Sequence, residues 1–413
     1  MPDNNDRVVI VGAGQAGGWL AATIRQLQPD RPVTLVGAED HPPYERPPLS
    51  KDILLGKADA ESAYIKPHSY YDENGIELIL GTEATRIDRD HRQVALSDGR
   101  TVGYATLAIA TGLRPRVLPV PGADHPKLRC LRTLADLDAI RGELAPGRHI
   151  VAIGAGFVGL EVAAAAIGAQ CRVTVVEAAP HALGRVMAPE VSEAIVLRHR
   201  DRGVTFLFGT HVTGIADDGG APVVELADGR AIRADMVLCG IGSLANDDLA
   251  REAGIACSEG IIVDETGRTS DPDIYAAGDV SVQMSAALGR RVRLESWQNA
   301  QNQAIAVGRH IAGAPEPYAE VPWFWTDQYE FNFQMVGMPQ HWDHIVWRGA
   351  PGDDKFTAIY LADGCVVGGN TMNNARDIRP LRQMIRDRVP VDARILADTA
   401  ISLVKLQKMQ AVQ

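Results

Sequence analysis

The feature that most constrains this chain of 413 residues is a pattern of strand, glycine turn, helix, strand and acid near its start. Residues 8–11 (Val-Val-Ile-Val) are typical of a short buried strand, and the glycine turn 12–17 follows at once. A helix is expected over 18–27 and a second strand over 33–36, with Glu39 just past its end. This order predicts a dinucleotide-binding α/β unit built on a parallel sheet.

The same order returns in the middle of the chain. Residues 150–153 indicate a strand, the glycine turn 154–159 follows, and an alanine-rich helix is expected over 160–167. A further strand over 172–176 leads into Glu177. One glycine motif alone is weak evidence, but two complete copies predict that the chain binds two dinucleotides.

Each glycine of such a turn has its own task. The first permits the tight turn, the second lets the backbone approach a pyrophosphate, and the third lets helix and strand pack closely. The helix N-terminus offers N–H groups to the phosphates, and the acid accepts hydrogen bonds from ribose hydroxyls. The glycines concerned are Gly12, Gly14 and Gly17 in the first copy, and Gly154, Gly156 and Gly159 in the second.

Two dinucleotide sites suggest one flavin and one nicotinamide. A short strand expected over 274–276 leads to Gly278 and Asp279, and an aspartate at such a place can hold ribityl hydroxyls of a flavin. An ordinary loop would account for the same pair of residues. A similar exit from a strand brings Thr111 and Gly112 to the end of the first domain.

Composition excludes several other classes of function. The formal net charge of −11 argues against a nucleic-acid-binding protein. Five scattered cysteines without a CxxC pair predict neither a thiol redox motif nor a metal site, and suit the cytoplasm. The N-terminus lacks the pattern of a signal peptide, and the apolar stretch 150–169 contains the second glycine turn, so we expect no membrane helix.

Four further segments are more selective than a glycine motif: Arg46-Pro-Pro-Leu-Ser-Lys51, Leu131-Arg-Thr-Leu134, Gly159-Leu-Glu-Val-Ala163 and Pro322-Trp-Phe-Trp-Thr-Asp-Gln-Tyr329. With them the chain resembles, over nearly its whole length, the FAD-dependent ferredoxin reductases of bacterial oxygenase systems, of the putidaredoxin reductase and biphenyl-dioxygenase ferredoxin reductase type. The resemblance implies an NADH:ferredoxin oxidoreductase that takes a hydride from NADH onto FAD and passes single electrons to a [2Fe–2S] ferredoxin. That ferredoxin would serve a Rieske dioxygenase or a haem-thiolate monooxygenase.

The resemblance also implies the architecture. We expect an α/β fold with two Rossmann-like dinucleotide-binding domains, like those of glutathione reductase, and a smaller α+β C-terminal domain. The FAD domain would comprise residues 1–114 and 245–320, the NADH domain residues 115–244, and the C-terminal domain residues 321–413.

The family's FAD contacts fall on the first glycine turn and on positions spread over the chain. In this sequence they are Gly12, Gly14, Ala16, Gly17, Glu39, Arg46, Lys51, Ala84, Thr111, Gly112, Arg132, Asp279 and Trp297. One position departs from putidaredoxin reductase, where the ribose-binding acid follows directly on the residues matching Val36 and Gly37. Here Ala38 stands at that place and the acid comes one residue later, which leaves the ribose role of Glu39 open.

The NADH contacts fall on the second glycine turn and the segments after it. They are Gly154, Gly156, Val158, Gly159, Glu161, Glu177, Arg185 and Gly242. A carboxylate at Glu177 accepts from a ribose 2′-OH and repels a 2′-phosphate, so we expect NADH rather than NADPH. His181 and Arg185 are the reservations, because either cation can pair with a 2′-phosphate.

The resemblance gives catalytic roles to Lys51, Glu161 and Trp325. Lys51 follows a stiff proline segment, and its ammonium would stabilise a reduced flavin, although a surface lysine would give the same pattern. Glu161 interrupts an apolar helix near its expected start, where the helix dipole alone would favour a carboxylate. In the family this glutamate lies near the nicotinamide and pairs with the lysine that Lys51 matches.

Aromatic and basic residues gather near the C-terminus. Six of the chain's aromatics fall within 323–333, and we expect most of them in the core of the C-terminal domain, with Trp325 near the flavin and Trp323 on the route to the partner. The C-terminal arginine patch comprises Arg376, Arg379, Arg382, Arg386 and Arg388, and a second patch comprises Arg290, Arg291 and Arg293. Either patch could steer a transient acidic ferredoxin, or simply be a solvated face. A monomer is expected.

Several alternatives share parts of this pattern. Disulfide reductases and NADH peroxidases need cysteines that residues 40–60 do not contain. A rubredoxin reductase has the same architecture and stays open. An NADH-responsive sensor like the apoptosis-inducing flavoproteins is the other alternative; no basic amphipathic helix supports a membrane-bound quinone reductase.

Overall fold

The computed structural model describes residues 6–184 and 186–410, which form two compact units. The first holds the residues up to Arg46, Asp59–Arg114 and Ser243–Pro322. The second holds Pro47–Ala58, Pro115–Gly242 and the residues from Trp323 onward. The predicted NADH and C-terminal domains thus fall almost entirely within the second unit, and the three-domain division stays a prediction.

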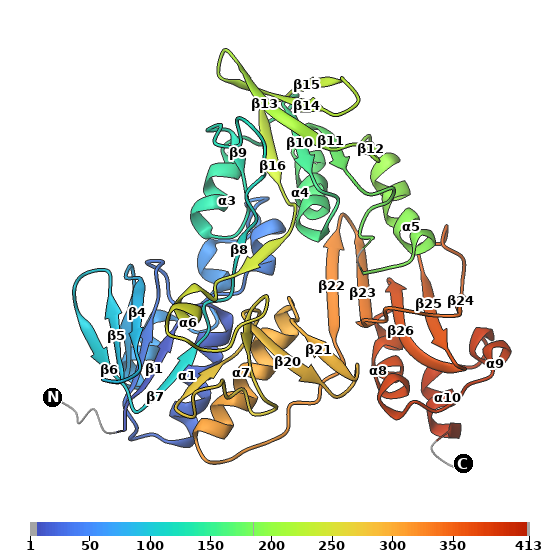
Figure 1. Ribbon diagram of the computed structural model, residues 1–413. Helices are drawn as coiled ribbons and strands as arrows, with labels where there is room; N and C mark the ends of the chain where they lie inside the picture. Colours follow the sequence, from blue (N-terminus) through green and yellow to red (C-terminus); the bar gives the residue numbers. More distant parts are fainter. Residues whose placement is uncertain (1–5, 185, 411–413) are drawn as a thin grey trace. The chain divides into compact units, whose positions relative to one another are not determined.

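The first unit is built on a parallel sheet with the strand order β19-β7-β1-β2-β3. Figure 1 labels β1 and β7 of this sheet. Its strands are β1 (Val8–Val11), β2 (Val33–Val36), β3 (Ile76–Ile79), β7 (Thr106–Ile109) and β19 (Ile274–Ala276). The predicted strands 8–11, 33–36 and 274–276 are confirmed. Successive residues of a strand point to opposite faces, so both faces of this apolar sheet must be covered.

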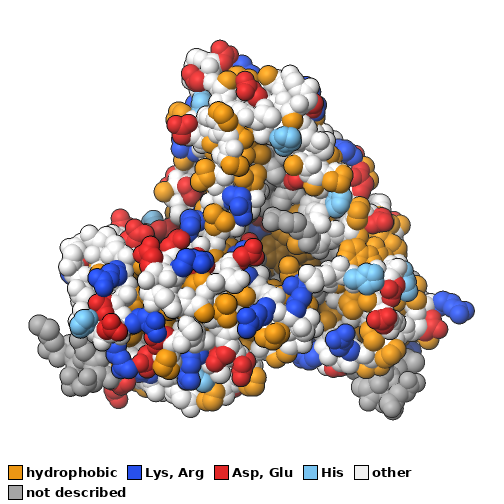
Figure 2. All heavy atoms as spheres, viewed as in Figure 1, with side chains coloured by type: hydrophobic (Ala, Val, Ile, Leu, Met, Phe, Trp, Pro, Cys, Tyr) orange, Lys and Arg blue, Asp and Glu red, His pale blue; other side chains and the backbone are white. Residues whose placement is uncertain are grey.

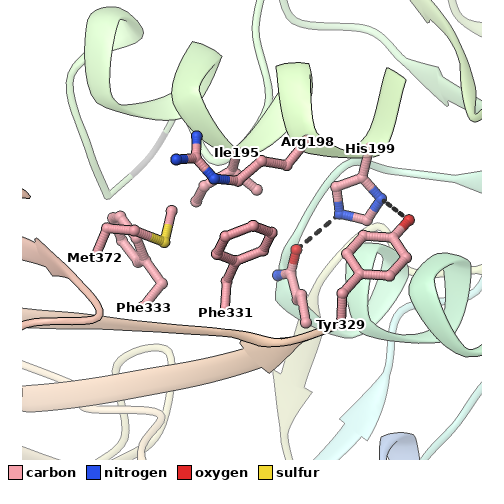
Figure 3. Close-up of a pocket in the computed structure, with 8 residues that line it drawn as sticks. Ile195, Arg198, His199, Tyr329, Phe331, Phe333 and Met372 are labelled. Atoms are coloured by element: carbon pink, nitrogen blue, oxygen red, sulfur yellow. Dashed lines mark hydrogen bonds between the residues drawn. The ribbon is translucent and has the colours of Figure 1, made fainter. Parts of the chain in front are cut away.

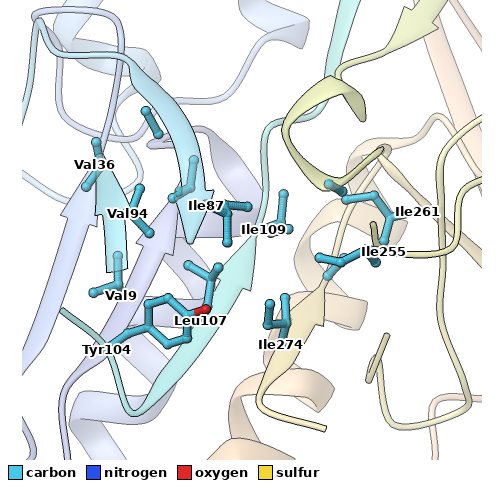
Figure 4. Packing of buried hydrophobic residues seen from close by; sticks show 14 of the residues in the cluster. Val9, Val36, Ile87, Val94, Tyr104, Leu107, Ile109, Ile255, Ile261 and Ile274 are labelled. Carbon is cyan, nitrogen blue, oxygen red and sulfur yellow. The ribbon is translucent and has the colours of Figure 1, made fainter. Parts of the chain in front are cut away.

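Helices cover one face of this sheet. Val8 and Ile10 pack there with residues of α1 (Gln15–Leu27) and α7 (Trp297–Ile311), among them Leu20 and Val307. Val9 and Val11 point to the other face, which is filled by residues such as Ile87 and Val94 of the antiparallel sheet β4-β5-β6 (Figure 4). Its strands are β4 (Ala84–Asp88), β5 (Gln93–Leu96) and β6 (Thr101–Gly103).

Shorter elements complete the first unit. They are η2 (Ala60–Ala63), α2 (His68–Glu73), β8 (Leu113–Pro115), β17 (Ser243–Ala245), α6 (Asp248–Glu252), β18 (Ile261–Ile262), β20 (Ser281–Ser285) and β21 (Arg290–Val292).

The second unit repeats the same plan with a parallel sheet in the order β12-β11-β10-β16-β9. Its strands are β9 (Leu128–Arg129), β10 (His149–Ile153), β11 (Arg172–Glu177), β12 (Thr205–Phe208) and β16 (Met236–Cys239). Its helices are α3 (Leu134–Arg141), α4 (Phe157–Gly168) and α5 (Pro189–Arg200), and an antiparallel sheet holds β13 (Val212–Asp218), β14 (Ala221–Leu226) and β15 (Ala231–Arg233). The predicted repeat of a dinucleotide-binding fold is therefore confirmed.

The C-terminal part of the second unit is an antiparallel sheet with the order β22-β23-β26-β25-β24. Its strands are β22 (Trp323–Gln328), β23 (Phe331–Gly337), β24 (His344–Arg348), β25 (Phe356–Ala362) and β26 (Cys365–Met372). The turns η1 (Pro47–Ser50) and η3 (Ala375–Asp377) and the helices α8 (Ile378–Asp387), α9 (Ala393–Ala397) and α10 (Leu403–Gln410) belong to the same unit. The predicted α+β C-terminal region is confirmed.

Both helices that follow a glycine turn begin three residues earlier than the sequence indicates. α1 starts at Gln15 and α4 at Phe157, directly after Gly14 and Gly156, whose extended backbone caps the helix without a side chain. Each helix N-terminus therefore opens into its glycine turn. In the part of the chain that the structure describes, no helix is both long and apolar enough to cross a membrane.

Candidate active site

The first glycine turn is shaped by its own backbone. Gly12 has φ of +111°, and a Cβ at this position would lie 2.3 Å from the carbonyl oxygen of Ala110. A Cβ on Gly17 would lie 1.9 Å from the carbonyl oxygen of Gly12. Gly14 instead faces open space, with nothing within 4 Å of its Cβ position. The fold thus requires the first and third glycines, while the second leaves the room that a pyrophosphate needs.

The second turn has the same construction in the second unit. A Cβ on Gly154 would lie 2.5 Å from the carbonyl oxygen of Gly240, and one on Gly159 would lie 2.4 Å from that of Gly154. The nearest atom to the Cβ position of Gly156 is 3.9 Å away. The residues present at both turns therefore fit a bound dinucleotide, with the N-terminus of α1 or α4 facing the phosphates.

Further predicted FAD residues gather at the same edge of the first sheet. The strands β1, β7 and β19 are parallel neighbours, so Gly12–Gly17, Thr111–Gly112 and Gly278–Asp279 all follow the carboxyl ends of adjacent strands. A Cβ on Gly278 would lie 2.8 Å from the Cβ of Ala16, which shows how closely the two loops approach. This edge is where doubly wound sheets bind their ligands.

Polar contacts hold the helices at this edge. The Gly278 amide donates to Gln303 Oε1 of α7 over 2.8 Å, and Gln15 Nε2 of α1 donates to the Trp297 carbonyl oxygen over 3.0 Å. The N-termini of α1 and α7 therefore lie together. Gln303, which the sequence did not single out, fixes the glycine that precedes Asp279.

Glu39 is held by its neighbours on the chain. Its Oε1 accepts from Arg46 over 2.9 Å and its Oε2 accepts from the hydroxyl of Tyr44 over 2.5 Å. The amide of Thr82 donates to the carbonyl oxygen of Gly37, which brings the buried Ala84 close to the same end of β2. Glu39 and Arg46 thus form one charged pair there, and the ribose role of Glu39 stays a prediction.

Glu177 is fixed beside the second turn by backbone donors. Its Oε2 accepts from the amide of Ala155 over 2.7 Å, and its Oε1 accepts from the amide of Ala179 over 2.8 Å. The carboxylate is therefore oriented before any ligand arrives. Val158 is exposed at the start of α4, and Gly242 has φ of +108° after β16, whereas Arg185 lies outside the described residues.

Lys51 and Glu161 form a buried ion pair in the second unit. The Lys51 Nζ lies 2.9 Å from Glu161 Oε1, and their side chains are 17% and 6% exposed. Two hydroxyls complete the carboxylate: Ser50 donates to Oε2 and Thr326 donates to Oε1 over 2.6 Å. Burying an ion pair is costly unless further hydrogen bonds satisfy it, and here they do.

The position of Glu161 in its helix corrects one expectation. Because α4 begins at Phe157, Glu161 is the fifth helical residue, and the first turn holds no acid. The helix dipole acts mainly on the first turn, so it does not by itself account for this carboxylate. The expected pairing of Glu161 with Lys51 is present instead.

The expectation for the aromatic cluster is wrong for most of its members. Of the six aromatics within 323–333, only Phe333 is buried, and the others are partly exposed. For Trp323 and Trp325 the reason is the two-residue period of β22, which turns Thr326 and Gln328 inward. Trp323 and Trp325 share the other face, where their rings stack with centroids 5.1 Å apart.

The remaining predicted groups lie on the surface or in the second unit. Arg132 lies just before α3, and its amide donates to Asp136. Arg132 and Lys51 both lie in the second unit, and their roles in binding FAD stay predictions. In the C-terminal arginine patch, Arg376, Arg379, Arg386 and Arg388 are exposed, because α8 buries its apolar side. In the second patch, Arg293 pairs with Glu295. Figure 2 shows acidic and basic side chains intermixed over the visible face.

Comparisons with known proteins agree over the whole chain. The pyridine nucleotide-disulphide oxidoreductase family matches residues 6–304, and the reductase C-terminal family matches residues 323–407. The ferredoxin–NAD(+) reductase component of the anthranilate 1,2-dioxygenase system of Burkholderia cepacia is 41% identical, over 96% of this chain and 98% of its own. Putidaredoxin reductase of Pseudomonas putida is 40% identical, over 97% of this chain and 96% of its own.

Solved structures give the same result. The covalent putidaredoxin reductase–putidaredoxin complex contains a chain with a TM-score of 0.96 and 39% identity, and each chain covers 100% of the other. The ferredoxin reductase for the CYP199A2 system of Rhodopseudomonas palustris has a TM-score of 0.94 and 37% identity, covering 98% of this chain and 100% of its own.

Proposed function

The chain belongs to the pyridine nucleotide-disulphide oxidoreductase family, and we propose that it is an NADH-dependent ferredoxin reductase of an oxygenase system. It uses FAD and NADH. The electron acceptor is a [2Fe–2S] ferredoxin, which in turn supplies a Rieske dioxygenase or a haem-thiolate monooxygenase. Its relatives over nearly the full length are reductases of that kind.

The observation that carries this proposal is the pair of glycine turns. Each unit supplies one turn in which the outer glycines are required by the backbone and the middle one leaves open space. One chain thus offers two dinucleotide sites. FAD, when bound, would supply the conversion from a two-electron hydride to single electrons, which an iron–sulfur acceptor requires.

The residues of the chain have separate tasks in this reaction. Gly14 and Gly156 give the pyrophosphates access, and Asp279 holds the ribityl hydroxyls. Glu177 accepts from the 2′-OH of the NADH ribose, and its fixed negative charge disfavours a 2′-phosphate, so NADH is preferred over NADPH. The Nδ1 of His181 faces its neighbour's carbonyl oxygen at 3.2 Å, which leaves only the other ring nitrogen for a ligand.

The ion pair fixes two charges in the second unit. Glu161 holds the Lys51 ammonium in one place, because both side chains are buried and the carboxylate accepts two further hydrogen bonds. We assign Lys51 to stabilising negative charge during flavin reduction and Glu161 to the nicotinamide side. Trp325, stacked on Trp323, is assigned to the electron route towards the partner.

The partner docks transiently through charge. The exposed arginines of the C-terminal patch suit an acidic ferredoxin, and electrostatic steering of this kind raises the association rate. A rubredoxin remains the second candidate acceptor. We also propose that the protein is a monomer. We place it in the cytoplasm, because its cysteines are scattered and free.

The test is steady-state electron transfer by the purified flavoprotein. NADH and NADPH are each offered with a [2Fe–2S] ferredoxin, with a rubredoxin, and with no protein acceptor. Turnover that requires both NADH and ferredoxin supports the proposal. Faster turnover with rubredoxin would favour the second candidate function. An enzyme that reduces neither ferredoxin nor rubredoxin would refute both candidates.

A further inference from the structure

A chain of four hydrogen bonds leads away from Glu161 within the second unit. Tyr329 and His199 Nδ1 are 2.9 Å apart, and His199 Nε2 lies 2.7 Å from Gln328 Oε1. Gln328 Nε2 donates to Thr326 Oγ1 over 3.1 Å, and Thr326 donates to Glu161 Oε1 over 2.6 Å. We call these five residues the His199 chain.

The direction of each bond in the chain is fixed by its chemistry. The oxygen of the Gln328 amide can only accept, so His199 must carry its proton on Nε2. In the neutral ring Nδ1 is then an acceptor, and it takes the proton of the Tyr329 hydroxyl. Thr326, which accepts from Gln328, has its one proton left for Glu161. All four donors therefore point towards the carboxylate.

The neutral state of His199 follows from its surroundings. Its side chain is fully buried, and burial lowers its pKa from 6.5 to about 4. The charge that acts on it is that of Arg202, which lies 4.4 Å from the ring centroid of Tyr329 and pairs with the exposed Glu330. The Arg202 cation disfavours a second proton on the ring, in the same direction as burial.

The fold holds the members of the chain in line. Thr326 and Gln328 lie two residues apart on β22 and so share its inward face, where both are buried. Tyr329 follows at the hairpin turn with φ of 55°, a left-handed backbone that is costly for a bulky residue. Figure 3 shows the imidazole of His199, from α5, with a dashed bond to Tyr329. The other ring nitrogen bonds to Gln328.

We propose, on the basis of the function proposed above, that His199 and Gln328 are positioning residues for the hydride-transfer step. They act through Thr326: aligned donors polarise one another, and the last of them holds the Glu161 carboxylate and the Lys51 ammonium in one orientation. The chain does not conduct protons, because the Gln328 amide would have to change tautomer to pass one on.

The first test measures flavin reduction by NADH in the holoenzyme, by stopped flow and without any protein acceptor. Thr326→Val, Gln328→Met and His199→Phe each remove one link, and each should lower the limiting rate ~3- to 10-fold, as one hydrogen bond allows. The NADH concentration for half-maximal rate should not change. His199→Gln, which keeps a donor at the ε position, should recover part of the loss.

A double-mutant cycle separates positioning from packing. If His199 acts through the Thr326 hydroxyl, His199→Phe adds no further loss in the Thr326→Val background. Additive losses, or single variants with unchanged rates, would overturn the proposal. The matched control is Thr357→Val, which removes a buried threonine hydroxyl bonded to Asp377 in the same unit and should leave the rate unchanged.

The second test does not depend on turnover. With ¹⁵N-labelled histidine, the holoenzyme should show His199 as a neutral ring protonated at Nε2, and Thr326→Val should shift that N–H resonance. A ring protonated at Nδ1, or no shift, would contradict the proposal even if His199→Phe failed to fold. Because neither test contains a ferredoxin, failure of the ferredoxin function would leave both results interpretable.

Discussion

Replacing Glu177 tests how the second dinucleotide site chooses its nucleotide. The carboxylate lies at the end of β11, where the amides of Ala155 and Ala179 hold both oxygens. It is thus fixed in place to accept from a ribose 2′-OH. Loss of one charge-assisted hydrogen bond costs roughly 1.5–3 kcal/mol. The Michaelis constant for NADH should therefore rise roughly 10- to 150-fold in Glu177→Ala.

The charge of Glu177 is tested separately by Glu177→Gln. Two unit charges 4 Å apart repel by about 4 kcal/mol at an effective dielectric constant of 20, and solvent at this half-buried site screens part of that. Removing the charge should therefore lower the Michaelis constant for NADPH while raising that for NADH.

The assay is NADH- and NADPH-dependent flavin reduction, with thermal unfolding measured for every variant. Glu193→Gln is the matched control, because Glu193 forms an exposed ion pair with Arg200 outside the site. The Michaelis constants of the Glu193→Gln variant for NADH and NADPH should not change. Unchanged constants for NADH in both Glu177 variants, with unaltered thermal midpoints, would remove Glu177 from the nucleotide site.

Three further predictions follow from the same geometry. The pKa of His199 is about 4 in the folded protein and 6.5 in the unfolded chain. Between these pH values the unfolded chain binds a proton that the folded protein does not, so the free energy of unfolding decreases as pH falls from 6.5 to 4. Denaturant unfolding should show a loss of roughly 3 kcal/mol that His199→Gln removes. Gly14→Ala should fold normally but retain less FAD on gel filtration, whereas Gly17→Ala, with its Cβ 1.9 Å from a carbonyl oxygen, should lower the thermal midpoint itself. Added salt should slow ferredoxin reduction and leave the rate with a small neutral acceptor unchanged, because docking at the C-terminal arginine patch is electrostatic; equal salt dependence for both acceptors would contradict this.

The repeated fold could be predicted because its signals are local. The apolar strands, the glycine turns and the acids lie within about thirty residues of one another in each copy. The helix starts were wrong by three residues for a physical reason. Gly14 and Gly156 cap α1 and α4 with an extended backbone, and no capping side chain marks the position in the sequence.

The surroundings of Glu161 could not be predicted from local patterns. Ser50 and Thr326 lie in segments that the resemblance singles out, yet their donation to Glu161 depends on which way β22 faces. His199 carries no signal of its own, because Gln328, its partner, is 129 positions away along the chain. Aromatic content suggested a packed core at β22, while the strand period placed polar residues there instead.

The most direct measurement is an anaerobic count of electrons. Purified flavoprotein is mixed with a limiting amount of NADH and an excess of oxidised [2Fe–2S] ferredoxin, and the reduced ferredoxin is measured by its absorbance. The account predicts two reduced ferredoxins for each NADH consumed, and none with NADH or the flavoprotein omitted. A flavin that is reduced by NADH while the ferredoxin stays oxidised would contradict it.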